Sequence, residues 1–184
     1  MKRIIKQNDS DILVENLNYT NPNQRPRIRE ILLSEQSFYC AYTEDRFSST
    51  NAFDIEHFNP DHTDIGYNSY QNWFAVCHRW NQIKKDEQWV TYESILYPTA
   101  EDLEDRIIYE NGYYVINGVE DTPAKNLIDF LDLNNYSLVD QRQKYIGYLR
   151  FIEDSGTPLI TLFANHPDSI KFRRGIETEF GIQV

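Results

Sequence analysis

Four polar residues in the middle of the chain have types and spacing that suit hydrolysis of a phosphodiester bond. Glu56 and His57 are adjacent, Asn72 follows fifteen residues after His57, and Asn81 follows nine residues later. Carboxylate and amide oxygens are ligands that a hard cation such as Mg²⁺ prefers. An imidazole that is neutral near pH 7 accepts a proton from an attacking water. The sequence therefore predicts a site for one divalent cation, Mg²⁺ or Mn²⁺, beside a general base.

Each of these residues has an expected role. Glu56 and Asn81 are expected to bind the metal, which would stabilise charge on the phosphorus and on the leaving oxygen. His57 is expected to be the catalytic base. Asn72 has no useful acid–base chemistry, so its amide is expected to bridge the backbone of the intervening loop and hold the imidazole. Asp54 points the same way as Glu56 on a strand; we expect a solvated acceptor behind the metal ligands, with direct ligation as the alternative.

Basic residues near this set are candidates for substrate binding. Lys84 and Arg79 flank Asn81 in the same predicted helix, and both are expected to contact the phosphate backbone. The alternative for both is ordinary surface charge. Farther back in the sequence, a second candidate patch consists of Arg25, Arg27 and Arg29.

The elements that must position these residues follow from the pattern of apolar residues. Residues 53–58 and 73–76 are predicted strands, and a helical pattern runs from Cys77 to about Asp86. The stretch between the strands contains Pro60 and Gly66 and is a predicted loop. It is long enough for the second strand to fold back beside the first. The helix would then pack across the hairpin and face the strand end that carries His57.

The rest of the chain adds helices and a further hairpin, so an α+β class is expected. Asn111 and Gly112 tolerate the positive φ angles of a type I′ turn and predict a hairpin over 106–116. Predicted helices end near Gln36, begin at Thr122 as N-cap, run over 137–153, and follow Pro167. The chain has 184 residues, which suits one domain spanning 1–184 with a helical C-terminal part over about 122–184.

Composition points to a folded protein with an unusual charge for a nucleic-acid binder. Hydrophobic residues make up 40% of the chain and charged residues 26%, and the formal net charge is -11. Because phosphate contacts need Lys and Arg, any nucleic acid must meet a local basic patch, or a partner must supply the groove. The sequence has neither an apolar run of spanning length nor a signal-type segment, so a cytoplasmic protein without membrane association is expected.

The order Glu56-His57, Asn72 and Asn81 resembles the HNH endonuclease family. The resemblance implies the ββα-metal fold, with an HNH core over about 38–90 and surrounding helices, and metal-dependent cleavage of DNA. Two further stretches are similar to one HNH subgroup: Leu33-Ser34-Glu35-Gln36 with Cys40-Ala41-Tyr42, and Leu131-Asp132-Leu133-Asn134 with Leu138 and Arg142. That subgroup includes the HNH component of Septu-type anti-phage systems, which works beside an ATPase. The resemblance thus implies anti-phage or mobile-element defence, with an ATPase as a possible partner.

One departure from this subgroup concerns zinc. The subgroup normally has two CxxC pairs that bind a structural zinc, but here Thr43 and Trp80 stand where the second Cys of each pair would be. A closed zinc site needs four ligands, so structural zinc is not expected. Trp80 is expected to fill the vacated volume. Cys40 and Cys77 are expected to lie close together, as apolar fillers or as a disulfide.

Two other functions are compatible with the sequence. A chain that lost a structural metal lost folding energy, and it could have become a catalytically silent HNH-fold module that binds a protein partner. The presence of Glu56, His57 and Asn81 argues against this alternative. A generic α+β binding domain would require the spacing of the four polar residues to be a coincidence.

Overall fold

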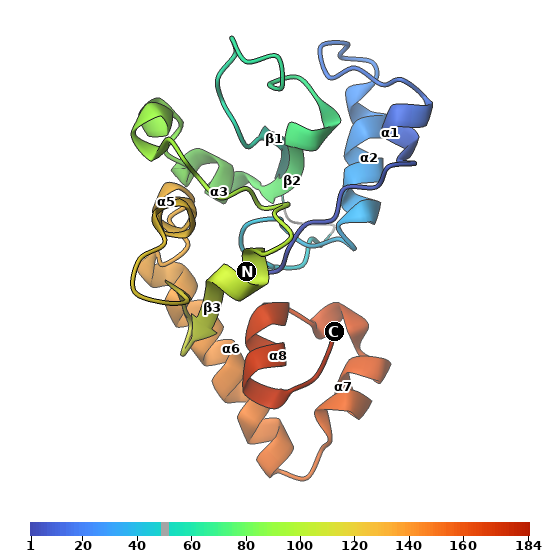
Figure 1. Cartoon of the computed structure of the whole chain (residues 1–184). Helices are drawn as coiled ribbons and strands as arrows, with labels where there is room; N and C mark the ends of the chain where they lie inside the picture. The colour runs from blue at the N-terminus through green and yellow to red at the C-terminus, as the bar shows by residue number, and fades with distance from the viewer. Residues whose placement is uncertain (49–51) are drawn as a thin grey trace.

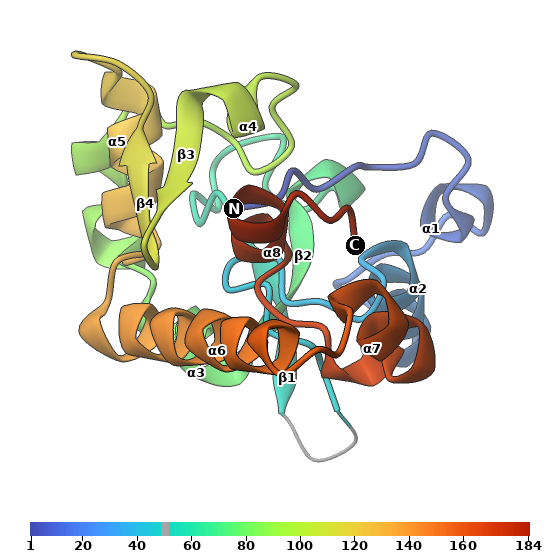
Figure 2. The ribbon, with the colours of Figure 1, turned by 90° about the horizontal axis from the view of Figure 1, so that it is seen from below.

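Two short antiparallel hairpins and a set of helices make up the computed structural model, which describes residues 1–48 and 52–184. The expected α+β class is confirmed. The part of the expected nuclease core that falls on residues 49–51 lies outside the described residues. Strands β1 (Phe53–His57) and β2 (Trp73–Cys77) form one hairpin (Figure 1), and β3 (Ile107–Glu110) and β4 (Tyr113–Ile116) form the other (Figure 2).

The helices surround these hairpins. They are α1 (Asp11–Val14), α2 (Arg25–Glu35), α3 (His78–Ile83), α4 (Leu103–Arg106), α5 (Thr122–Phe130), α6 (Tyr136–Asp154), α7 (Leu159–Asn165) and α8 (Arg173–Phe180). Three 3₁₀ segments are η1 (Tyr70–Asn72), η2 (Asp86–Tyr92) and η3 (Pro167–Ser169). In the described part of the chain, no helix is both long and apolar enough to cross a membrane.

The β1–β2 hairpin stands between α2 and α3 (Figure 1). Its register places Glu56 opposite Phe74 and His57 opposite Trp73. The edge of β2 that faces away from β1 is closed by a side chain. The amide of Gln36, which directly follows α2, accepts from Ala75 N at 2.8 Å and donates to Ala75 O at 2.9 Å. The sheet therefore ends at two strands without a free edge on β2.

The second hairpin has the turn that the sequence predicts. Asn111 and Gly112 have φ angles of 45° and 90°, as a type I′ turn requires. A Cβ atom at Gly112 would lie only 2.7 Å from a side-chain carbon of Gln143 and 3.1 Å from the backbone oxygen of Val139. Glycine therefore serves both the turn and the close approach of α6.

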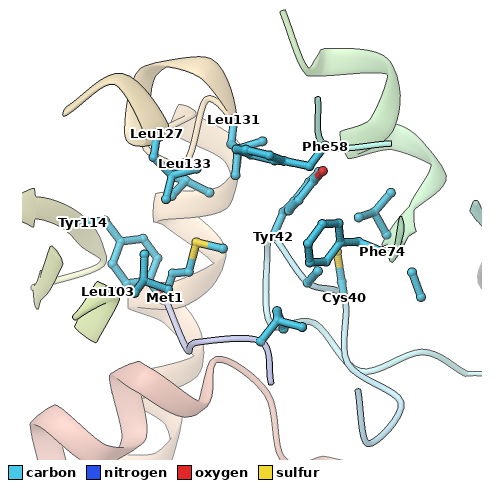
Figure 3. Packing of buried hydrophobic residues seen from close by; sticks show 14 of the residues in the cluster. Met1, Cys40, Tyr42, Phe58, Phe74, Leu103, Tyr114, Leu127, Leu131 and Leu133 are labelled. Atoms are coloured by element: carbon cyan, nitrogen blue, oxygen red, sulfur yellow. The ribbon is translucent and has the colours of Figure 1, made fainter. Parts of the chain in front are cut away.

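Phe58 anchors the end of β1 in the hydrophobic core. This residue is fully buried, and its ring meets the rings of Phe74, Trp89 and Phe130 at centroid distances of 6.2, 5.8 and 5.8 Å. Figure 3 shows Leu131 beside the same ring. Because Phe58 directly follows His57, its packing against β2, η2 and α5 fixes the strand end that carries the candidate site.

Helix α6 packs against the turn of the second hairpin and against α7 and α8, and α8 lies between α6 and the N-terminal segment (Figure 2). Arg142 on α6 is fully buried and donates to the backbone oxygens of Gly112 at 3.0 Å and Leu133 at 2.8 Å. One side chain thus joins the β3–β4 turn, the α5–α6 connection and α6.

Some expected boundaries were wrong. The helix expected to run to about Asp86 ends at Ile83, because Lys84 has an extended conformation (φ -53°, ψ 136°) that turns its side chain into the interior. The N-cap of α5 is Asp121 instead of Thr122, since its carboxylate accepts from Ala124 N at 3.1 Å. Helices α1, α4 and α7 were not predicted; all three have seven residues or fewer and present little periodicity.

Candidate active site

Two pairs of side chains join β1 to α3. Asp54 and Glu56 project from one face of β1, since they are two positions apart on a strand. Asn81 on α3 donates to Asp54 Oδ2 at 3.0 Å, and Lys84, directly after α3, donates to Glu56 Oε1. The two contacts lie side by side and place one surface of α3 against one surface of β1. Glu56 and Asn81 therefore occupy facing surfaces.

Lys84 does not have the expected accessibility for a phosphate contact. Its side chain is fully buried, and its ammonium binds Glu56, the backbone oxygen of His57 at 2.6 Å and Asp86 Oδ1 at 2.8 Å. Burial lowers the pKa of Lys84 to about 8, against the opposing effect of Asp86. We correct its role from substrate binding to positioning, because the ammonium holds the Glu56 carboxylate and the end of β1.

Asp54 binds two residues of α3 with one oxygen. His78 Nδ1 lies 2.7 Å from Asp54 Oδ2, the same oxygen that accepts from Asn81. Because the Asn81 amide nitrogen is used by Asp54, its amide oxygen is the atom left to bind a cation. Asp54 thus orients Asn81, as an acceptor behind the expected metal ligands would. His78 is half exposed and has this acidic partner.

His57 lies in an aromatic enclosure. Its ring stacks on Tyr67 with centroids 4.3 Å apart, and the Tyr19 ring meets its edge at 4.8 Å. Burial lowers the pKa of His57 to about 4. Its Nε2 atom is buried and has no hydrogen-bond partner among the described residues. A neutral imidazole with an unused nitrogen is the state that a general base requires.

Asn72 bridges the loop between β1 and β2. Its Oδ1 accepts from Asn59 N at 2.8 Å, and its Nδ2 donates to the backbone oxygens of Asn59 and Tyr67, both at 2.9 Å. This is the backbone bridge that the sequence suggests. Since Tyr67 stacks on His57, the amide also fixes one wall of the imidazole enclosure. A direct part for Asn72 in catalysis stays a prediction.

A surface cavity of about 500 Å³ opens along β1 between α2 and α3. Asp54 and Asn81 form one side of it, and Arg25 and Arg29 of α2 form the other. Tyr19 also lines this cavity and touches His57, so the cavity lies next to the imidazole.

Arg79 does not line this cavity. It is exposed, and its guanidinium lies 5.5 Å from the Trp80 ring. Two positions along a helix correspond to a rotation of about 200°, so Arg79 points away from the face of α3 that carries Asn81. Its expected contact with substrate is therefore not supported by its position beside Asn81.

The oxygen donors on the facing surfaces suit Mg²⁺. Glu56 offers a carboxylate, Asn81 an amide oxygen, and Asp54 a second carboxylate nearby. Among residues 1–48 and 52–184, no group of three or more His, Cys, Asp or Glu side chains could hold a metal ion. A cation bound here would have few protein ligands and would keep several waters, which is the usual arrangement for Mg²⁺. Binding of Mg²⁺ or Mn²⁺ stays a prediction.

The two cysteines lie together as free thiols. Cys77 N donates to Cys40 Sγ at 3.2 Å, and Thr43 Oγ1 lies 4.0 Å from Cys77 Sγ. A separate interaction between the two side chains, in which the Cys77 thiol is the donor, raises the pKa of that thiol, and burial acts in the same direction. Trp80 is buried and packs against Cys77, with Leu138 and Phe172. The positions that correspond to the two CxxC pairs of the HNH subgroup therefore converge, with a hydroxyl and an indole in place of two thiols.

Several functional contacts had no signal in the sequence. Tyr19 and Tyr67 come from irregular segments, and nothing in their spacing links them to His57. The contact between His78 and Asp54 depends on how α3 packs against β1, which the sequence pattern does not define. By contrast, Arg25 and Arg29 were recognised as a candidate patch, but their distance along the chain gave no sign that they would face Asn81.

No family model matches the chain, and no curated protein sequence matches it. The resemblance to the HNH family therefore rests on the residues named above.

Proposed function

We propose that the chain is a metal-dependent endonuclease of the HNH type, which hydrolyses phosphodiester bonds of DNA on a ββα-metal core formed by β1, β2 and α3. One observation supports this most. The face of β1 that carries Asp54 and Glu56 lies on the face of α3 that carries Asn81, at the strand end where the neutral, partly unpartnered imidazole of His57 is held.

Each residue of the site has its own role in the proposed hydrolysis. His57 accepts the proton of a water whose oxygen attacks the phosphorus, and the bond from phosphorus to the leaving oxygen breaks. Its low pKa keeps the imidazole neutral at pH 7, which is the form that accepts a proton, although the same burial makes it a weaker base than a solvated imidazole. Asn72 and Tyr67 hold the ring in position. Glu56 and Asn81 would hold Mg²⁺ or Mn²⁺, which when bound stabilises negative charge on the phosphoryl and leaving oxygens.

A plasmid-nicking assay tests this proposal. Purified wild type and His57→Ala are incubated with supercoiled plasmid in Mg²⁺, in Mn²⁺ and in EDTA. Loss of a general base costs about 10²- to 10⁴-fold in rate, so His57→Ala is expected to nick at least 10²-fold more slowly, and EDTA is expected to abolish nicking by both proteins.

The matched control is His166→Ala, which removes an exposed histidine after α7. It is expected to nick at the wild-type rate, and its melting temperature and that of His57→Ala are measured to exclude unfolding. Equal nicking by wild type and His57→Ala would show that a contaminant cuts the plasmid, and the proposal would fail.

The setting of this activity is proposed from the sequence resemblance. It points to anti-phage or mobile-element defence in the cytoplasm, with an ATPase as partner. The net charge of -11 supports dependence on a partner, since free acidic residues repel the phosphate backbone. Co-purification of the chain with the products of neighbouring genes, followed by mass spectrometry, tests for the ATPase.

A second candidate function is a catalytically silent module that binds a protein partner. One observation favours it: the carboxylate of Glu56, the expected metal ligand, already pairs with the buried ammonium of Lys84. A wild-type chain that cleaves no plasmid in Mg²⁺ or Mn²⁺, with or without the co-purified partner, would favour this candidate over the nuclease.

A further inference from the structure

The cavity along β1 has walls of opposite chemistry. Asp54 and Asn81 lie on the α3 side, whereas Arg25 and Arg29, one helical turn apart, lie on the α2 side. Side chains four positions apart on a helix lie on the same face, with Cβ atoms about 6 Å apart. We infer that Arg25 and Arg29 bind the phosphodiester backbone of a nucleic-acid strand beside the candidate active site. The inference rests on the proposed function, because it assigns the substrate wall of the same site.

The charge distribution of the molecule supports this position. Most exposed cationic side chains have an acidic partner: Arg27 with Asp11 and Glu15, Lys125 with Asp129, Lys144 with Asp140, and Arg150 with Glu179. Within the described chain, the exposed Lys and Arg side chains without an ion pair are Arg25, Arg29 and Arg79. Two of these three line one cavity, so two exposed cations without an acidic partner lie together there, opposite Asp54.

Both guanidinium groups are held in place by neighbouring groups, and both keep N–H donors that make no hydrogen bond within the described chain. Arg25 Nε donates to Tyr19 O at 2.9 Å, and the guanidinium lies 4.5 Å from the Tyr19 ring. Arg29 lies 3.7 Å from the Phe53 ring and has no hydrogen bond to another described residue. Aromatic faces hold an arginine without using its N–H groups. The remaining donors match the oxygens of a phosphodiester, which arginine binds with two parallel bonds.

Arg27 provides an internal control. It lies between the two cavity arginines in sequence but on another face of α2, and its guanidinium is 2.6 Å from Glu15 and 3.0 Å from Asp11. If binding required only positive charge on α2, the loss of Arg27 would weaken it as well. If Arg25 and Arg29 bind the phosphates directly, the loss of Arg27 has no effect.

Binding of a fluorescein-labelled 20-base-pair duplex to the full chain tests the inference. Anisotropy is measured in EDTA, so that hydrolysis plays no part, over a series of salt concentrations. Each phosphate contact contributes about 0.9 to the slope of log affinity against log salt. Arg25→Gln with Arg29→Gln is expected to weaken binding at least tenfold at low salt and to lower the slope by about 2. Arg27→Gln is expected to change neither.

Two further measurements exclude a structural effect. Replacement of both cavity arginines with lysine is expected to keep most of the salt slope, because the charges remain, and melting temperatures show that each variant folds. The inference is overturned if the wild type does not bind the duplex, if the double Gln variant binds as wild type does, or if Arg27→Gln causes the same loss. Because no metal is present, these outcomes are independent of whether the chain cleaves plasmid.

Discussion

His57 is the residue on which the proposed chemistry depends, and its environment is mainly aromatic. Tyr19, Tyr67 and Trp73 surround the imidazole, with ring centroids 4.8, 4.3 and 6.3 Å away. Such an enclosure shields most of the ring from solvent, which disfavours the charged imidazolium and lowers the pKa. The same burial that makes His57 a neutral base at pH 7 should therefore make the fold sensitive to acid.

The acid sensitivity is a testable prediction. The pKa of His57 is about 4 in the folded chain and 6.5 ordinarily, so between these values the unfolded chain binds the proton and the folded chain does not. Above pH 6.5 His57 is neutral in both states, and its contribution to the free energy of unfolding is at its maximum. As the pH falls from 6.5 toward 4, the free energy of unfolding decreases by less than about 1.4 kcal/mol per pH unit for this one proton. Urea unfolding at pH 7, 6 and 5 is expected to show a smaller acid loss for His57→Gln than for wild type.

His166→Gln is the matched control for this measurement, because solvent reaches that residue in both the folded and the unfolded chain. It is expected to follow the wild-type pH dependence. Identical acid losses for wild type and His57→Gln would mean that the imidazole is not desolvated in the folded protein.

At the residue scale, the sequence predicted contacts that depend on neighbours along the chain. Alternation on a strand placed Asp54 with Glu56, and the loop length brought Asn72 back to the strand end. The sequence could not predict the burial of Lys84, because a basic residue after a helix is usually solvated. Only the tertiary contacts with Glu56 and Asp86 offset the cost of removing its ammonium group from water. The aromatic enclosure of His57 escaped prediction for a similar reason, since Tyr19 arrives from a distant loop.

Two amide side chains close the edges of the two hairpins. Gln36 pairs with the backbone of Ala75 in β2, and Asn134 pairs with Tyr114 in β4, accepting from N and donating to O at 2.8 Å each. An open edge would otherwise offer unpaired backbone groups to another chain. Both residues lie in the stretches that carry the family resemblance, so these stretches have a structural reason for their residue types.

Elements with strong local signals were predicted well. The Asn-Gly turn, the two strands of the first hairpin and helix α6 follow from turn chemistry and periodicity over several residues. The short helices were missed because a single turn has too few residues to display a period. Their stability comes from packing against the core, as with Leu103 of α4, which is fully buried.

Arg142 provides a prediction at the scale of elements. Its guanidinium binds the backbone oxygens of Gly112 and Leu133, and it lies 4.4 Å from the Tyr114 ring. Arg142→Met would leave two buried carbonyl groups without donors, and each unsatisfied group costs about 1–3 kcal/mol. Urea unfolding is expected to show a loss of about 2–4 kcal/mol.

The control for Arg142 is Lys144→Met on the exposed face of the same helix, where the lysine has a surface ion pair with Asp140. Exposed i,i+4 pairs contribute about 0.5 kcal/mol, so its loss is expected to be of that size. Equal stability of Arg142→Met and Lys144→Met would show that the buried guanidinium does not join the hairpin to α6.

At the scale of the whole molecule, Glu44 connects segments from both ends of the chain. Its carboxylate accepts from Lys2 N at 2.9 Å, from Tyr114 O–H at 2.6 Å and from Arg174 N at 2.8 Å. The N-terminal segment, β4 and α8 therefore meet at one buried acid. Burial alone would raise the pKa of Glu44, but nearby positive charge and the hydrogen bonds from Arg174 N and Tyr114 O–H outweigh it, and the pKa is lowered.

Replacement of Glu44 should therefore destabilise the fold in a pH-dependent way. Hydrogen bonds to a charged group contribute about 1.5–3 kcal/mol, so Glu44→Gln is expected to cost about 2 kcal/mol in urea unfolding at pH 7. Because the folded pKa is lowered, this contribution is complete above the ordinary value of 4.5 and is lost as the pH falls below it. The difference from wild type should shrink at pH 3.5. The control is Glu110→Gln, at an exposed position of β3, whose free energy of unfolding should stay within about 0.5 kcal/mol of the wild-type value. If Glu44→Gln lowers the free energy of unfolding at pH 7 by no more than this control does, Glu44 is not charged in the folded protein.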